Sequence, residues 1–290
     1  MSNQIAFDTI TDQIIDQIES GMADDCWTMP WHKATGLPTN VASNKPYNGI
    51  NIVSLWFSSV GQGFTSNTWG TFKQWKALEC PVKKGSKGTK VVFWKGIEVQ
   101  DKTNPDETKV IPMAKVYTVF NADQVDGYVE PESPKAISDI ESLAYVDNVV
   151  EATGAHILHQ GNQACYIPSQ DKILMPSKDS FYTTTGYYST LLHELAHWTG
   201  HASRLDRTLK GQNNRTEYAI EELIAELSAA FSCAALGITS EPRPDHAIYI
   251  KSWLRALKND KKFIFEASKL ASKATQYLME PNPQELQDAA

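Results

Sequence analysis

The chain has 290 residues, of which 41% are hydrophobic and 21% are charged, and this composition is that of an ordinary globular protein. No stretch approaches the roughly 20 apolar residues of a membrane span, and the opening residues lack the basic segment of a signal peptide. The four cysteines are scattered without a CxxC pair, which argues against a zinc ribbon and against a disulfide framework. We therefore expect a cytoplasmic protein that does not contact membranes, with a length typical of about two domains.

The net charge of −7 is distributed unevenly along the chain. Residues 31–95 contain nine lysines and a single acid, Glu79, and so carry +8. The rest of the chain then carries −15. An asymmetry of this size within one chain indicates that one part contacts a polyanion and the other does not.

The first part of the chain is rich in aromatic residues and mixes helical and strand patterns. Its opening residues predict an amphipathic helix with five isoleucines on one side. In chain order we expect a helix over residues 1–20, an irregular stretch over 26–40, helices over 47–61 and 68–79, and strands over 90–99 and 114–125. A polar loop with turn residues separates the two strands.

The second part of the chain is mainly helical in its periodicity. Two prolines and several acids predict a linker over residues 127–142. After it we expect a helix over 140–154, two short strands within 163–177, and helices over 189–201, 217–237, 244–260 and 261–279. The predicted fold class is α+β with two domains. They are a mixed α/β domain over residues 1–126 and a mainly helical domain with a small sheet over residues 143–290.

The stretch TLLHELAHWTGH, residues 190–201, places His193 and His197 one helical turn apart. Side chains at i and i+4 share a helix face, so both imidazoles can hold one metal ion. Glu194 is offset by one position, where its carboxylate can take a proton from an attacking water. The alternative is a chance HExxH motif on a buried helix, with one histidine hydrogen-bonded in the core.

A third metal ligand decides between these interpretations. Gly200 matches the extended motif HExxHxxGxxH, but Ser203 stands where that motif has its third histidine. The stretch EELIAE instead offers Glu222 and Glu226 on an apolar helix, where burial is costly unless the carboxylates are paired or coordinated. We predict Glu222 as the third ligand and Glu226 as the acceptor of a ligand histidine N–H, with the reverse assignment open. The alternative is that both form a solvated face with Glu221. The expected ion is Zn²⁺, with another divalent metal as the alternative.

The strands predicted within residues 163–177 precede the metal helix. In zincin-like hydrolases a sheet edge beside that helix holds an extended peptide by strand addition. Three tyrosines near the motif are candidate oxyanion donors, with core packing as the alternative for each: Tyr187, Tyr188 and Tyr218.

The basic segment interleaves aromatic residues with its lysines. Nucleic-acid bases stack on aromatic rings at about 1–3 kcal/mol each, and lysines follow the phosphates. The predicted DNA-binding residues are Trp31, Tyr47, Trp69, Trp75, Lys83, Lys84, Lys87 and Lys90. The alternative is that the aromatic rings form the core of the domain. Motifs for sequence-specific readout are absent, so we expect binding without sequence preference.

Several motifs together resemble those of the ArdC-type antirestriction proteins of conjugative plasmids. They are PYNGIN, WGTFKQW, KKGSKGTKVVFW, VYTVFNADQV, YYSTLLHELAHWTGHASRLDR and YAIEELIAELSAAF, and they span the chain from about Ile14 to Tyr277. The first part is also similar to the accessory region of some plasmid DNA primases.

The resemblance implies a non-specific single-stranded-DNA-binding domain followed by a zincin-like, Spartan-like metallopeptidase domain. It also implies protection of incoming conjugative DNA from host restriction. The metal motif of the family falls on His193, Glu194 and His197, with a glutamate from EELIAE. Expected partners are single-stranded DNA and either a host restriction enzyme or a DNA-bound protein substrate. The alternative is a catalytically silent zincin-like scaffold that coats DNA or binds the restriction enzyme.

Overall fold

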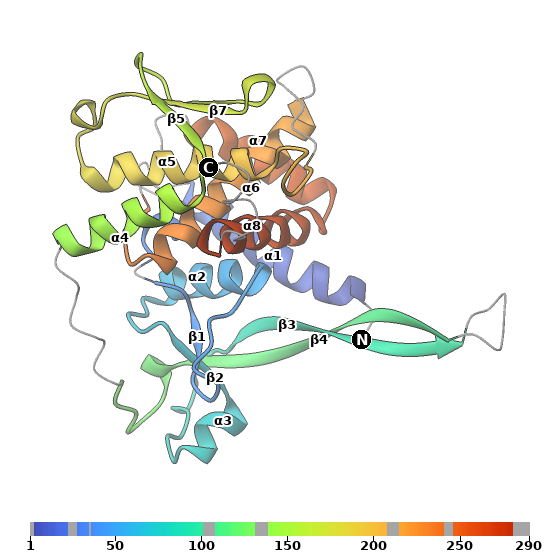
Figure 1. Ribbon diagram of the computed structural model, residues 1–290. Helices are drawn as coiled ribbons and strands as arrows, with labels where there is room; N and C mark the ends of the chain where they lie inside the picture. The colour runs from blue at the N-terminus through green and yellow to red at the C-terminus, as the bar shows by residue number, and fades with distance from the viewer. Residues whose placement is uncertain are drawn as a thin grey trace.

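The computed structural model describes residues 3–22, 28–34, 36–100, 108–130, 139–207, 215–240 and 246–280 (Figure 1). Eight α-helices are found among these residues: α1 (Asn3–Gly21), α2 (Ile50–Gln62), α3 (Phe72–Ala77), α4 (Asp139–Ala152), α5 (Thr184–Thr199), α6 (Arg215–Ala235), α7 (His246–Asn259) and α8 (Phe263–Met279). None of the helices in the described ranges combines the length and the apolar character that a membrane crossing requires. The predicted α+β class is confirmed.

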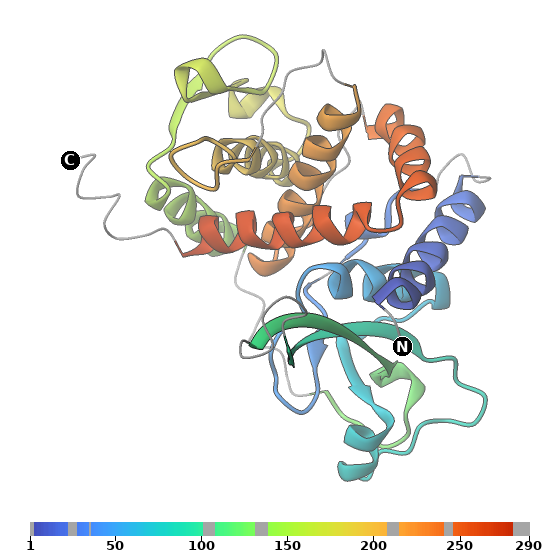
Figure 2. The same ribbon diagram turned by 90° about the vertical axis from the view of Figure 1, so that its right-hand side faces the viewer.

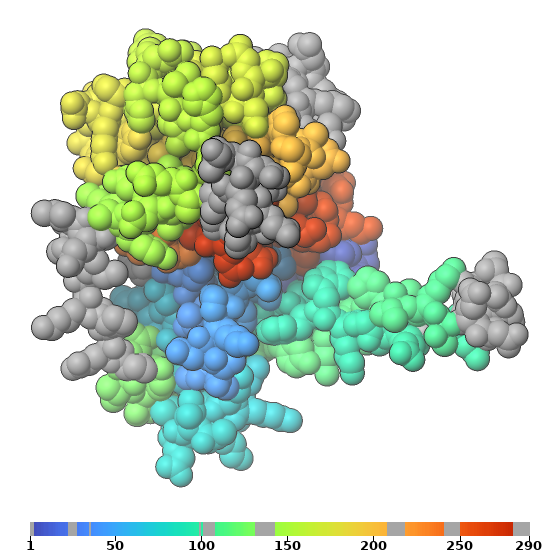
Figure 3. Space-filling view, in the orientation of Figure 1, coloured from blue at the N-terminus to red at the C-terminus, as the bar shows by residue number. Residues whose placement is uncertain are grey.

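A four-stranded sheet organises the first part of the chain. Its order is β1 (Thr39–Asn40), β2 (Thr68–Thr71), β4 (Thr108–Asn121) and β3 (Thr89–Gln100). β1 pairs parallel to β2, and the other neighbours are antiparallel. The ends of β3 and β4 extend beyond the sheet as a two-stranded arm that projects from the body of the molecule (Figures 1 and 3).

Three predicted elements in this part differ from the observed ones. The helix predicted over 68–79 is divided, because the side chain of Thr71 accepts the N–H of Gln74 and the side chain of Gln74 accepts the N–H of Thr71. This reciprocal cap begins α3 at Phe72 and leaves β2 before it. β4 begins at Thr108, inside the predicted polar loop, because residues 108–119 pair with β3 along the whole length of β3. α4 begins at Asp139, inside the predicted linker, and residues 131–138 of the linker lie outside the described ranges.

The second part packs its helices against a small sheet of order β5 (His156–His159), β7 (Lys172–Met175) and β6 (Cys165–Ile167). β5 runs parallel to β7, and β6 runs antiparallel to it. β6 and β7 are the two strands predicted within residues 163–177, whereas β5 was not predicted. Gly154 and Gly237 stand at the predicted ends of two helices. Their φ angles are 68° and 71°, in the left-handed region that is common at helix C-termini.

The two parts of the chain share a hydrophobic core. One cluster of buried residues joins α1, α2, β3 and β4 to α6, α7 and α8. A second cluster joins α4, α5, β5 and β7 to α6 and α8. α6 and α8 therefore contribute to both clusters and lie between the small sheet and the first part of the chain (Figure 2).

Trp253 tests whether this core is cooperative. The ring is fully buried beside Trp31 of the first part, and its N–H donates to the carbonyl of Ala219 at 3.1 Å. We expect Trp253→Ala to lower the free energy of unfolding by about 3–5 kcal/mol. Guanidinium unfolding followed by circular dichroism and by tryptophan fluorescence should still show one transition. Tyr182→Ala, at a fully exposed position, is the matched control. Two separated transitions in the wild type would contradict a shared core.

Candidate metal centre

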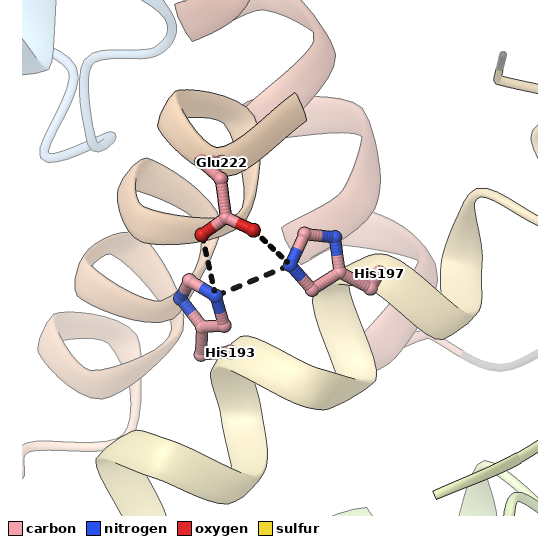
Figure 4. Close-up of side chains that lie close together, drawn as sticks. All are labelled: His193, His197 and Glu222. Atoms are coloured by element: carbon pink, nitrogen blue, oxygen red, sulfur yellow. Dashed lines mark hydrogen bonds and ion pairs between the residues drawn. The ribbon is translucent and has the colours of Figure 1, made fainter. Parts of the chain in front are cut away.

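Two helices bring together the three predicted metal ligands. His193 and His197 lie one turn apart on α5, and their Nε2 atoms are 3.2 Å apart. Glu222 lies opposite them on α6, with its carboxylate oxygens 3.6 Å from each of these nitrogens. Figure 4 shows the three side chains converging on one point. Nitrogen and oxygen atoms of the three residues lie within 4.8 Å of one another.

This arrangement fits a divalent metal. An ion held about 2.0–2.1 Å from two nitrogens in tetrahedral geometry separates them by about 3.3 Å. The observed separation of the two Nε2 atoms is 3.2 Å. Two imidazoles and one carboxylate form the ligand set of catalytic zinc sites, which keep a fourth position open.

A carboxylate lies behind His197. The Nδ1 atom of His197 is 3.1 Å from Oε1 of Glu221, which also accepts from Arg207 at 2.8 Å. The same guanidinium donates to the carbonyl of Ala196 at 2.6 Å and to the hydroxyl of Thr199 at 2.8 Å, both on α5. Arg207 thus ties Glu221 to α5, and Glu221 orients the ring of His197 so that Nε2 faces the site.

A second carboxylate lies behind His193 and leads into the first part of the chain. Oε2 of Glu226 is 3.5 Å from Nδ1 of His193, within the distance of an ion pair but without the geometry of a hydrogen bond. Oε1 of Glu226 is 3.1 Å from Nε2 of His32, close enough for an ion pair although the angle departs from that of a hydrogen bond. The other ring nitrogen of His32 lies 3.3 Å from the hydroxyl of Ser240. All three side chains of this chain of contacts, His32, Glu226 and His193, are buried.

Glu194 faces the edge of the small sheet. Its Oε2 accepts the backbone N–H of Tyr166, on β6, at 2.8 Å. Because this N–H donates to Glu194, the edge of β6 that is not paired with β7 borders the carboxylate. Cys165 lies exposed on the same strand, and partial desolvation by its neighbours together with the charge of Glu194 raises the pKa of its thiol.

The buried charges strongly perturb the titration of the site. Burial by itself lowers the pKa of His197, but hydrogen bonds to Glu221 and Glu222 outweigh it and raise the pKa to about 10. Burial likewise raises the pKa of Glu222, but the hydrogen bonds of His193 and His197 outweigh it and hold that pKa well below its usual range. A metal binds neutral imidazole, so it must displace the proton of His197, and metal affinity should fall as the pH is lowered.

The structure therefore brings together more residues than the sequence indicated. Glu222 faces both histidines and Glu226 lies behind His193, but the predicted hydrogen bond from a ligand histidine to Glu226 is not formed at 3.5 Å, and the roles of both glutamates stay predictions. Glu221, Glu222 and Glu226 are all buried, so they do not form a solvated face. The contacts of Glu221 and His32 were missed. The RLDR stretch offered one signal for Arg207, a basic residue close after the motif, whereas nothing in the sequence connects His32 with α6.

Two of the candidate oxyanion donors have other hydrogen-bond partners. The hydroxyl of Tyr187 is 2.8 Å from Nε2 of His159, and the hydroxyl of Tyr188 donates to Asp147 at 2.6 Å. Tyr218 is half-buried on α6, one turn before Glu222. Among the three, only Tyr218 precedes a metal-facing residue by one turn on the same helix.

The structure corrects the predicted base-stacking residues. The rings of four of them are buried in the core, with 0–7% exposed: Trp31, Tyr47, Trp69 and Trp75. They cannot stack on a nucleic-acid base without leaving the core. Three other aromatic side chains of the basic segment are 47–55% exposed: Phe72, Phe93 and Trp94.

The four predicted DNA-binding lysines differ in exposure and in hydrogen bonding. Lys84 and Lys87 are exposed. Lys83 is exposed too, and its ammonium donates to the carbonyl of Asp123 at 3.0 Å. Lys90 is half-buried and donates to the hydroxyl of Thr118 at 2.7 Å. The exposed lysines of the 82–90 loop are thus open to a polyanion, while Lys90 is engaged within the sheet.

Two histidines and a glutamate on one helix, completed by a glutamate from a second helix, define a zincin-like metallopeptidase domain. The model of the zincin-like metallopeptidase family matches residues 144–270. The model of the N-terminal domain of the anti-restriction factor ArdC matches residues 5–120.

Two crystal structures of the antirestriction protein ArdC from plasmid R388 are similar to this chain. The metal-free structure is 41% identical with a TM-score of 0.79, covering 94% of this chain and 96% of that one. The Mn(II)-bound structure is 39% identical with a TM-score of 0.77, covering 98% of both. This chain belongs to the ArdC family of antirestriction proteins.

Two further relatives differ in length. The uncharacterized protein y4eC of Sinorhizobium fredii is 43% identical over 93% of this chain and 89% of its own length. A DNA primase TraC of Escherichia coli is 35% identical over 97% of this chain, which spans only 20% of that primase.

The contacts behind the ligands predict a graded effect on metal affinity. Glu226→Gln should weaken metal binding by about 10- to 100-fold, because the partner of His193 Nδ1 loses its charge. His32→Leu should weaken it less, by about 3- to 10-fold, through Glu226. His32→Gln places an amide N–H near the position of Nε2 and should restore most of the affinity. Chelator competition measures this series. Equal affinity in His32→Leu and the wild type would show that this contact does not position the ligand.

Proposed function

We propose that this chain protects incoming single-stranded DNA from restriction by binding it without sequence preference and by metal-dependent proteolysis of proteins on it. The proposal places its action in the cytoplasm, where conjugative plasmid DNA enters. The observation that carries the proposal is the convergence of His193, His197 and Glu222 on one point. Membership of the ArdC family supports the antirestriction role.

The residues of the site support peptide hydrolysis. A divalent metal, with Zn²⁺ as the expected ion, would acidify a water and polarise the scissile carbonyl. In this proposal Glu194 would accept the proton of the attacking water and pass it to the leaving nitrogen. The unpaired edge of β6 borders Glu194, so an extended peptide added to this edge would place its backbone at the carboxylate.

The distribution of charge supports DNA binding by the first part. The +8 of residues 31–95 includes the exposed Lys84 and Lys87 beside the glycines of the 82–90 loop. Phe72, Phe93 and Trp94 provide exposed aromatic rings in the same segment. Ammonium groups with nearby aromatic faces are the combination that binds single strands without reading their sequence.

A shared core would keep the two activities close together in space. Proteins on the same DNA strand would then meet the metal site at a high effective concentration. We therefore propose as substrates DNA-bound proteins, which include a restriction enzyme, and the chain itself.

Glu194→Gln separates proteolysis from metal binding. The variant should keep the metal and the fold, because Glu194 is outside the ligand set, and it should lose proteolysis by about 10²- to 10⁴-fold through loss of the base. The measurement is cleavage of a DNA-bound protein and self-cleavage, with and without single-stranded DNA, together with metal content. Cleavage by Glu194→Gln at the wild-type rate would refute Glu194 as the base.

The same variant tests the scaffold alternative in cells. If proteolysis protects DNA, cells carrying Glu194→Gln should lose protection of an incoming plasmid. The opposite outcome is that Glu194→Gln protects the plasmid fully and that the wild type cleaves no protein. This outcome would leave DNA coating as the mechanism of protection and would refute proteolysis.

DNA binding is tested by its salt dependence. Each lysine that neutralises a phosphate contributes about 0.7 to the slope of log K against log salt for single strands. Lys84→Ala with Lys87→Ala should therefore flatten the slope by about 1.4. The matched control is Lys251→Ala with Arg255→Ala, which removes the same charge from exposed positions on α7. Fluorescence anisotropy of a labelled oligonucleotide measures the slope for the wild type and for the two double variants. Equal slopes in these three proteins would place the DNA-binding site away from Lys84 and Lys87.

A further inference from the structure

A cavity of about 870 Å³ lies between the two parts of the chain, apart from the metal centre. Its walls come from α1, α2, β3 and β4 on one side and from α6 and α8 on the other. His193, His197 and Glu222 do not line it. Figure 2 shows α8 running above α2 and the sheet of the first part, the elements whose residues line the cavity.

The inner wall of the groove is aromatic. Phe7 contacts Phe265 edge to face, with ring centroids 4.8 Å apart, and lies 5.9 Å from the ring of Trp94. Trp94 nevertheless keeps 47% of its surface exposed. A large aromatic ring that is half exposed beside other aromatic rings can pack against a planar ligand.

The rim of the groove on α8 is basic. Lys262, Lys269 and Lys273 line it, all exposed, at a spacing that places them on one helix face. Glu266 is the one acid in this stripe and lies 3.9 Å from Lys269. The stripe stands out because the chain outside residues 31–95 is acidic. At 1.5 Å per residue it extends over about 16 Å, which suits a chain of negative charges better than a single one.

The floor of the groove is the PYNGIN motif, which the metal centre does not explain. Residues 47–51 of this motif line the cavity. Gly49 has φ of 54°, a left-handed conformation that favours glycine, and its N–H donates to the hydroxyl of Ser272 on α8 at 2.9 Å. The motif is therefore shaped by its contact with α8, and it joins the groove walls of the two parts.

We propose that this groove is a binding site for single-stranded DNA, with a base on Trp94 and phosphates on Lys269 and Lys273. An aromatic wall beside a row of ammonium groups is complementary to unpaired bases joined by phosphates. Bases of a duplex are stacked and paired, and they cannot enter the groove. The strand would then lie on α8, within the metallopeptidase part, as well as on the first part. This inference rests on the proposed function and extends the DNA site across the boundary between the two parts.

The test compares three pairs of substitutions that each remove two positive charges. They are Lys269→Ala with Lys273→Ala in the groove, Lys84→Ala with Lys87→Ala in the loop, and Lys251→Ala with Arg255→Ala on α7. Fluorescence anisotropy with a labelled single-stranded oligonucleotide is measured over a range of salt. The groove pair should flatten the slope of log K against log salt by about 1.4, and the α7 pair should leave it unchanged.

Two single substitutions distinguish binding in the groove from a general effect of lost positive charge. Trp94→Ala should weaken single-strand binding by about 5- to 100-fold and leave binding to a blunt duplex unchanged. Glu266→Gln should strengthen single-strand binding, because it removes the one negative charge of the rim. Circular dichroism and metal content confirm that each variant is folded.

The outcomes separate this inference from the proposed function. Failure of the wild type to bind single strands would overturn both. A different result would overturn the groove and leave the proposed function. In that result the loop pair flattens the salt slope, the groove pair keeps the wild-type slope, and Trp94→Ala binds single strands with wild-type affinity.

Discussion

The burial of three carboxylates on α6 is the constraint on which the rest of this structure depends. Glu221, Glu222 and Glu226 are removed from water on a helix whose other buried residues are apolar except for Ser228 and Ser232. Burial of an ion costs several kcal/mol unless a partner compensates it. The partners come from separate places in the chain: Arg207 and His197 for Glu221, both metal-facing histidines for Glu222, and His193 with His32 for Glu226. α5, the loop after it and the turn at His32 must all dock on α6 before these charges are compensated.

The same contacts prepare the site for its ion. Because Glu221 and Glu226 lie at the Nδ1 sides of the two histidines, their Nε2 atoms face Glu222. The cost of ordering the ligands is then met during folding and does not have to be met when the ion binds. The helix that carries the third ligand, α6, is anchored in both hydrophobic clusters.

Local patterns carried most of what could be predicted from the sequence. The spacing of His193 and His197 is a property of one helix, and the apolar neighbours of Glu222 reveal that it is buried, so both could be found without coordinates. The contact between His32 and Glu226 joins residues far apart in the chain, and no local pattern records it. The aromatic residues of the basic segment were ambiguous for a related reason. Trp69 and Phe93 both stand in strands, and only the packing of α2 and α3 on the sheet decides which ring is covered.

The shared core also has a consequence for gene fusion in this family. The two family models end and begin on either side of residues 121–143, yet a segment cut there would expose the faces of α6, α7 and α8 that pack against α1 and α2. We therefore expect gene fusion to add this chain to a larger protein as a whole unit. The TraC primases follow that rule, because similarity extends over 96–97% of this chain although it makes up only 20–27% of their length. The hydrophobic interface between the two parts thus sets the smallest segment of the gene that we expect to be transferred to another protein.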